Sequence, residues 1–366
     1  MLDSYEEKPV LYDASVEHLE ENESETIQEL IETLQSISHI TSTDYGHAVR
    51  SVHAKCQGIL RGKIIVKESL PPELKQGLFK EPKTYPVVIR FSTSPGDILA
   101  DSVSTPRGMA IKILGVEGER LSANNSDSTQ DFLLVNSPAF IKPDAKSFLT
   151  SFILLAKTTD KAEGLKKVLS SALQGTEKLI ETFGGESPTI KSMGGHPETN
   201  ILGETFFSQV PILYGQYMAK VSIEPATQEL IALKNSELSL DDNPDGIREA
   251  VSYFFNNNSA RWDLKIQLCR NLETMPIEDA SVIWPEDESP YITVATIEVE
   301  PQISWDDDTY PLIEDKLAFS PWNCIKEHRP LGSIMRARRL TYQQSNAYRK
   351  QFNGCPMHEI SSLSDL

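Results

Sequence analysis

Cysteine is scarce in this chain: four of its 366 residues are cysteines, at positions 56, 269, 324 and 355. No two of them form a C-x-x-C pair, and none stands at a spacing to histidine that is typical of zinc sites. Disulfide frameworks belong to short, cysteine-rich secreted chains. We therefore expect buried or incidental thiols rather than a disulfide scaffold or a zinc site.

Basic residues are also few, since 35 Lys and Arg stand against 53 Asp and Glu and give a net charge of −18. That charge repels phosphate backbones and anionic lipid, so we expect no nucleic-acid partner and no membrane partner. No apolar run approaches the roughly 20 residues that span a bilayer. The acidic N-terminus lacks the basic and apolar regions of a signal peptide. We expect a cytoplasmic protein.

The residues that are present predict both helices and strands. Apolar residues at helical spacing predict a helix from Ser24 to about His39, and the same pattern continues in later segments. Short β-branched runs bounded by Pro, Gly, Asp or Asn predict strands between them. The expected strands cover 62–66, 86–93, 109–116, 131–136, 217–225, 263–269 and 291–300, and the further helices cover 145–156, 161–173 and 334 to about 353. This order favours an α+β fold with a mainly antiparallel sheet, and closure into a barrel would remove its edge strands.

One short stretch, HAVRSVHAKCQGIL at 47–60, places His53 between Val52 and Ala54, three residues after Arg50. A histidine between small apolar residues is most often a core residue with one hydrogen-bond partner. Desolvation by such neighbours would favour the neutral imidazole. These residues alone leave both a structural and a chemical role open.

The stretch SIMRARRLTYQQSNAYRKQ at 333–351 places Arg338, Tyr342 and Arg349 on one helix face, because four and eleven residues are close to one and three turns. Such a basic face is often merely solvated. A guanidinium near a tyrosine, however, favours the phenolate, which is a good ligand for ferric iron. A second arginine could bind a carboxylate through its planar fork.

Five segments together resemble the haem catalase superfamily, in the family's order. RSVHAKCQG resembles its distal-histidine motif, VIRFST its Val-Arg-Phe-Ser-Thr segment, and TPRGMAIKI its Asp-Pro-Arg-Gly strand. DFLLVNSPAF is similar to its Asp-Leu-Val-x-Asn-Asn-Thr-Pro segment, and RRLTY to its Arg-Leu-Phe-Ser-Tyr motif. The matches cover most of residues 47–352, and the chain most resembles the small catalase-related bacterial subgroup.

The resemblance implies a catalase-like antiparallel eight-stranded β-barrel with surrounding and C-terminal helices. The chain would then be one domain over 1–366, with a helical N-terminal segment at 1–45. The barrel core with its helical insertion would cover 46–310, and a C-terminal helical region at 311–366 would carry the haem ligand. One haem b would lie between the barrel and that last helix. A homo-oligomer, either dimer or tetramer, is also implied.

On the peroxide side of the haem, the resemblance assigns catalysis to three residues. His53 would be the distal acid–base, Ser92 would orient its imidazole, and Asn136 would be the distal amide. Val52 would sit over the porphyrin beside His53. The family's Asn-Asn pair is reduced here to Val135-Asn136, so Asn136 stands one position from the catalytic asparagine of the larger enzymes.

On the other side, Tyr342 would be the proximal iron ligand and Arg338 its charge partner. Phe148 would stack on the haem by a gapless count from Asp131. Three arginines would meet the haem propionates or line their entry, namely Arg50, Arg90 and Arg349. The proline that usually follows the proximal tyrosine is Gln343, and no NADPH site can be transferred.

Three functions remain open at this point. A catalase would convert two hydrogen peroxide molecules into water and dioxygen. A haem peroxidase, or an enzyme acting on organic or fatty-acid hydroperoxides, would share the site; allene oxide synthases on this fold carry threonine where Val52 stands, which favours ordinary peroxide chemistry here. A non-enzymatic haem protein is the third.

Overall fold

The computed structural model describes residues 8–103, 105–121, 128–156, 198–240, 242–354, 360 and 362–365. Within them, nine antiparallel strands form one sheet in the order β5-β4-β3-β2-β1-β9-β8-β7-β6. Pairing of β5 with β7 closes eight strands into a barrel, and β6 continues from β7 as a hairpin. This closed barrel with helices beside it confirms the expected fold. The strands are β1 (Lys55–Val66), β2 (Thr84–Thr93), β3 (Arg107–Leu114), β4 (Thr129–Val135), β5 (Phe206–Phe207), β6 (Ile212–Tyr214), β7 (Tyr217–Pro225), β8 (Ala260–Leu268) and β9 (Ile292–Val299).

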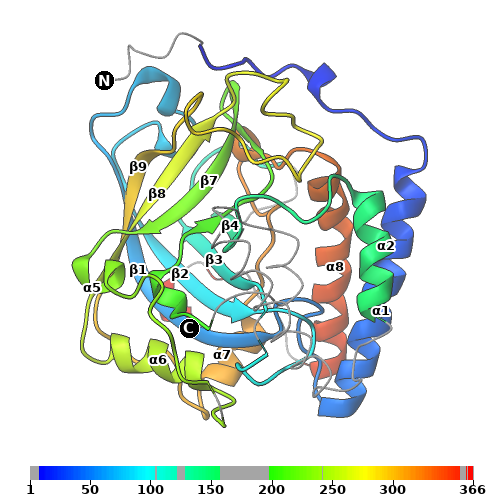
Figure 1. Cartoon of the computed structure of the whole chain (residues 1–366), viewed down its shortest axis with the longest axis vertical. Coiled ribbons are helices and arrows are strands. Elements are labelled where there is room, and N and C mark those ends of the chain that lie inside the picture. The colour runs from blue at the N-terminus through cyan, green and yellow to red at the C-terminus, as the bar shows by residue number, and fades with distance from the viewer. Residues whose placement is uncertain are drawn as a thin grey trace, which may run out of the picture.

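Three long helices stand side by side against one flank of the barrel (Figure 1). They are α1 (Glu23–Tyr45), α2 (Ala145–Ala156) and α8 (Ser333–Asn353). Shorter helices cover other parts of the barrel, namely α5 (Gln228–Ile231), α6 (Gly246–Phe255) and α7 (Tyr310–Lys316). Among the described helices, none combines the length and apolar character needed to cross a membrane.

Two of the four apolar clusters among the described residues are the barrel interior and the packing of the long helices. The barrel interior is filled by alternate strand residues and large aromatic side chains, including Phe91, Phe206 and Trp262. A separate cluster joins the three long helices through residues such as Leu30 and Ile334. The alternation follows from the strand period of two residues, so the other strand faces are free to meet the helices.

The sequence placed the start of the first strand too late. It expected a strand at 62–66, but β1 begins at Lys55. Its first six residues are all buried, so the alternation that signals a half-exposed strand is missing there. Gly58 explains part of this burial, because a Cβ at that position would lie 2.9 Å from Val251 of α6.

The first helix also runs past its expected end near His39 to Tyr45. The added turns carry polar but buried residues, Thr41 and Ser42, and Ser38 is buried just before them. The Thr41 hydroxyl donates to the carbonyl of Ile37 at 3.0 Å. The Ser42 hydroxyl forms a hydrogen bond of 2.7 Å with the hydroxyl of Tyr348, which lies on α8. Apolar periodicity cannot detect a helix face that packs through hydroxyl groups.

Other sequence predictions have mixed outcomes. The helix expected at 145–156 and the C-terminal helix are present, and the helix expected at 161–173 lies outside the described residues. The helices α5, α6 and α7 and the short strands β5 and β6 were not predicted. Cys56, Cys269 and Cys324 are free and buried, as expected, and burial raises the pKa of both Cys269 and Cys324 to about 12.

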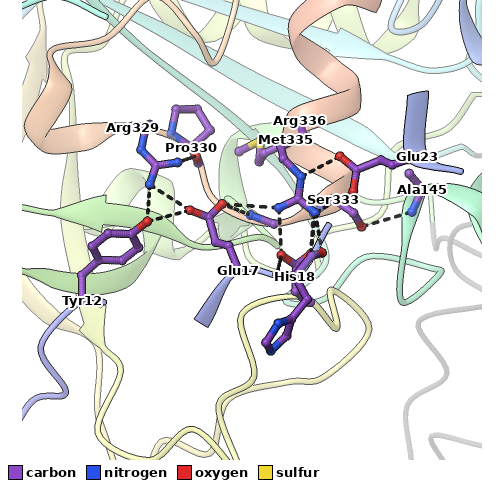
Figure 2. Close-up of polar contacts among 12 residues, drawn as sticks. Tyr12, Glu17, His18, Glu23, Ala145, Arg329, Pro330, Ser333, Met335 and Arg336 are labelled. Atoms are coloured by element: carbon purple, nitrogen blue, oxygen red, sulfur yellow. Dashed lines mark hydrogen bonds and ion pairs between the residues drawn. The ribbon is translucent and has the colours of Figure 1, made fainter. Parts of the chain in front are cut away.

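The N-terminal arm before α1 is fastened to the beginning of α8 by ion pairs (Figure 2). Arg336 donates to both carboxylate oxygens of Glu23 at 2.7 Å, and also to Glu278 at 2.8 Å. Glu17 accepts from Arg329 at 2.8 Å and from Arg336 at 3.4 Å. This network therefore ties the arm and the first residue of α1 to the beginning of α8.

Candidate active site between barrel and helices

A cavity of about 300 Å³ lies between the barrel and the three long helices. Its walls are mainly apolar, with Leu30 and Leu34 from α1, Phe148 and Phe152 from α2, and Met109 from β3. Its polar groups come from elements far apart in the sequence: the loop before β1, the strand β2 and the helix α8. An apolar chamber with a few converging polar groups is the usual form of a small-molecule or cofactor site.

His53 lines this cavity from the barrel side. Its backbone has a φ of 54°, which is uncommon for a residue other than glycine. Its Nδ1 lies 3.3 Å from the Ser92 hydroxyl on β2. Gly108 on β3 leaves room for the ring, because a Cβ there would lie 2.9 Å from that same Nδ1. Ser92 and Gly108 therefore fix where the imidazole stands.

The surroundings of His53 favour its neutral form. Enclosure away from bulk water lowers the pKa of His53, and the positive charges of Arg90 and Arg338 lower it further, to about 3. The imidazole is therefore a proton acceptor at neutral pH. This agrees with the expectation from its apolar sequence neighbours.

Arg50 and Arg90 also line the cavity, and both donate to Glu314 of α7. Burial, together with repulsion from Arg90 and Arg349, holds the pKa of Arg50 well below its ordinary value. Arg349 lies beside them and donates to the Glu314 carbonyl at 3.1 Å, but it is not among the cavity-lining residues. The three predicted arginines thus gather at one place, two of them in the cavity wall.

Tyr342 and Arg338, which their spacing placed on one helix face, both line the cavity from α8. The Arg338 guanidinium stacks over Phe140 at 5.7 Å from the ring centre. Phe148 lines the cavity as well, with its ring centre 5.0 Å from that of Phe140. Val52, which is 38% exposed, lines it next to His53.

Asn136, like Arg349, is a predicted site residue that does not line the cavity. Its carboxamide accepts from the Arg107 backbone N–H at 3.0 Å and donates to Glu204. Val135 lines the cavity instead. A strand turns successive side chains to opposite faces, so a shift of one position exchanges an amide for an apolar side chain.

Sequence reasoning missed three residues of this site. Gly108 could have been noted from its place in TPRGM, since a glycine inside a strand often marks a close approach. Glu314 lies in an acidic segment with no distinctive pattern. Gln209 lines the cavity with a φ of 62°, and its amide donates to the Ala139 carbonyl at 2.7 Å.

The chain was compared with known sequences and with solved structures, and similar proteins were found among the structures. No protein-family model and no curated protein matches the sequence. Among solved structures, a fungal catalase matches with a TM-score of 0.60 and 19% identity over 85% of this chain and 61% of its own. Catalase A from Saccharomyces cerevisiae matches with 0.59 and 18% over 96% and 70%.

A bacterial catalase matches with a TM-score of 0.56 and 18% identity, over 88% of this chain and 64% of its own. The chain thus spans about 61% to 70% of the length of these three catalases. At such identities the likeness concerns the fold. The chain therefore has a catalase-like fold, with its cavity walled by the barrel and the C-terminal helix.

Proposed function

We propose that the chain binds one haem b in this cavity and breaks hydrogen peroxide down to water and dioxygen, while also accepting organic electron donors. The observation that carries the proposal is the arrangement of polar groups around one apolar cavity. A neutral histidine faces it from the barrel side, a tyrosine faces it from α8, and three arginines, Arg50, Arg90 and Arg338, stand in its wall. The likeness to catalases supports the same chemistry.

The residues of the cavity fit a haem. A flat macrocycle needs apolar walls, which Phe148 and Met109 help to supply, and its propionates need cations such as Arg50 and Arg90. Within the described residues, no three His, Cys, Asp or Glu side chains group as they would around a bare metal ion. If Tyr342 is the only protein ligand, the other iron ligands would have to come from a cofactor such as a porphyrin.

His53 would carry out the proton transfers of the reaction. When bound, the haem supplies the iron centre at which the peroxide O–O bond is cleaved. Ser92, accepting from Nδ1–H, would leave Nε2 as the proton acceptor. Nε2 would take a proton from one peroxide oxygen and return it to the leaving oxygen, which then departs as water rather than as hydroxide.

A second candidate function has an observation in its favour. The chain brings Val135 rather than Asn136 to the cavity, so the peroxide loses an amide partner and meets a more apolar wall. That favours turnover of organic hydroperoxides, or oxidation of organic donors, over a purely catalatic cycle. Val52 argues against an allene-oxide-synthase-like reaction, because no hydroxyl stands beside His53 at that position.

Oxygen yield tests the proposal and separates the two candidates. We would reconstitute the chain with haemin and measure dioxygen released per peroxide consumed, with and without a phenolic donor. We expect dioxygen in the absence of donor and a lower yield in its presence. Val52→Thr should depress the yield while haemin stays bound. Peroxide turnover no faster than that of free haemin would contradict the proposed enzyme, and a full yield that no donor diverts would contradict the peroxidase branch.

A further inference from the structure

Glu314 on α7 contacts three arginines, of which Arg50 and Arg90 line the cavity and Arg349 lies beside them. Arg90 donates through Nε to both Glu314 oxygens at 2.9 Å, and its terminal nitrogen lies 2.7 Å from the same carboxylate. Arg50 makes an ion pair with it, and Arg349 donates to the Glu314 carbonyl at 3.1 Å. One residue of this seven-residue helix is thus the common partner of three cations, two through its carboxylate and one through its backbone carbonyl.

Glu314 stands behind the wall rather than in the cavity. Arg50 and Arg90 line the cavity, and Glu314 does not. Its side chain is 14% exposed, and that of Arg90 is 3% exposed. Burying guanidinium groups so completely is costly unless they are paired. The carboxylate therefore holds the arginines from behind and leaves their cavity side open to a ligand.

Arg90 extends this arrangement to His53. A terminal nitrogen of Arg90 donates to the His53 carbonyl at 3.0 Å and to the Ala54 carbonyl at 3.3 Å. These bonds grip the backbone where His53 has its φ of 54°. A residue in a sparsely populated conformation persists only where its surroundings hold it there. Glu314, Arg90 and the His53 backbone form one continuous chain of contacts.

Glu314 also offsets positive charge behind the cavity wall. Its carboxylate pairs with both Arg50 and Arg90, and the neighbouring Asp315 acts on Arg50 through space. Without Glu314, two buried guanidinium groups would lose their carboxylate partner, and unmatched charge costs most where burial is deepest.

We propose that Glu314 is a positioning residue that sets both the carboxylate-binding arginines and, through Arg90, the backbone of His53. Its part in ligand binding rests on the proposed haem function, whereas its hold on His53 does not. Glu314 itself contacts neither substrate nor cofactor. Through it, α7 links ligand binding at the arginines to the geometry of the catalytic base His53.

The test compares Glu314→Gln with Asp315→Asn, a matched loss of one charge on the next residue of α7. Asp315 contacts His47 at 2.9 Å and makes no hydrogen bond to Arg50 or Arg90 among the described contacts. The first readout is the proton–carbon NMR spectrum of the ligand-free protein labelled at histidine, with His53 assigned through His53→Gln. We expect Glu314→Gln to move the His53 resonance and Asp315→Asn to move that of His47 only.

The second readout is haemin affinity, titrated into the same ligand-free variants. Loss of charged hydrogen bonds should raise the Kd of Glu314→Gln by about 10-fold to 100-fold, and Glu314→Asp, which keeps the charge, should recover part of that loss. Tighter haemin binding by Glu314→Gln would overturn the proposal, since Glu314 would then compete for the arginines. An unmoved His53 resonance would overturn it too. Failure of the unchanged protein to bind haemin would instead count against the haem function, with the NMR result still deciding the hold on His53.

Discussion

Several neighbours of His53 together fix the position of its imidazole, as a catalytic base requires. Ser92 meets Nδ1, Gly108 leaves space for the ring, and the Arg90 side chain grips the carbonyl. The resemblance indicated the histidine, its serine and the one-position offset of Asn136. It could not indicate that the Asn136 carboxamide turns toward Arg107 and Glu204, because the face on which a residue at a strand end lies depends on the strand register.

Removal of the base should slow the chemistry without emptying the site. We predict that His53→Ala lowers the rate of peroxide cleavage by about 10²-fold or more, the usual scale for losing a general acid–base. Stopped-flow absorbance of the haemin-loaded protein measures this rate. Asn136→Ala is the matched control and should change the rate little, since its carboxamide faces Arg107. Wild-type cleavage by His53→Ala would remove His53 from the mechanism.

The pH profile of the same rate gives an independent check. The pKa of His53 is lowered to about 3 by burial and by Arg90 and Arg338, so the acceptor form is present throughout the neutral and mildly acidic range. We predict no loss of kcat/KM between pH 8 and pH 5 that is due to this group. An acid limb with a midpoint near the ordinary histidine value of about 6.5 would contradict the assigned environment.

A second buried histidine ties stability to pH. His328 accepts from the Leu78 N–H at 3.0 Å, and burial lowers its pKa to about 4. His328 therefore takes up a proton more readily in the unfolded chain than in the folded chain. The contribution of His328 is complete above about pH 6.5 and is lost as pH falls toward 4.

We predict that His328→Gln, which keeps an acceptor for Leu78, loses less stability on acidification than the unchanged protein does. The difference in the free energy of unfolding between pH 7 and pH 4.5 should be smaller by about 2–3 kcal/mol. Urea unfolding at the two pH values measures it, with the exposed His39→Gln as control. Equal acid sensitivity in the unchanged protein and His328→Gln would refute the neutral buried state.

At the scale of elements, hydroxyl groups join the helices to the loop that carries His53. The Ser51 hydroxyl lies 2.7 Å from that of Ser38 on α1 and 3.0 Å from that of Ser345 on α8. Sequence periodicity found the apolar faces of these helices but stopped α1 near His39, since its last turns pack through serine and threonine. The first half of β1 was missed for a related reason, because burial on both faces removes the alternation.

Ser51 should therefore matter more than either of its partners. We predict that Ser51→Ala lowers the free energy of unfolding by about 1–3 kcal/mol, since it removes two buried hydrogen bonds of roughly 0.5–1.5 kcal/mol each. Ser38→Ala and Ser345→Ala should each lower it by about half as much. Denaturant unfolding of the three variants provides the comparison. If Ser51→Ala lowers the free energy of unfolding no more than Ser345→Ala does, Ser51 does not contribute two stabilising hydrogen bonds.

At the scale of the whole molecule, the polar groups of the cavity come from three parts of the chain that only the fold brings together. His53 precedes the first strand, Arg90 lies on the second, and Tyr342 lies on the last helix. Spacing within one helix predicted that Arg338 and Tyr342 share a face. The meeting of Tyr342 with His53 at one cavity followed from the resemblance to a family and not from spacing, and Glu314 followed from neither.

The central claim is that this cavity is a haem site with Tyr342 as the iron ligand. Titration of the ligand-free chain with haemin, followed by the absorbance spectrum of the ferric complex, tests it most directly. We predict saturation at one haemin per chain and a phenolate-to-iron charge-transfer band that disappears in Tyr342→Phe. Absence of saturable binding, or an unchanged ferric spectrum and iron content in Tyr342→Phe, would contradict the account.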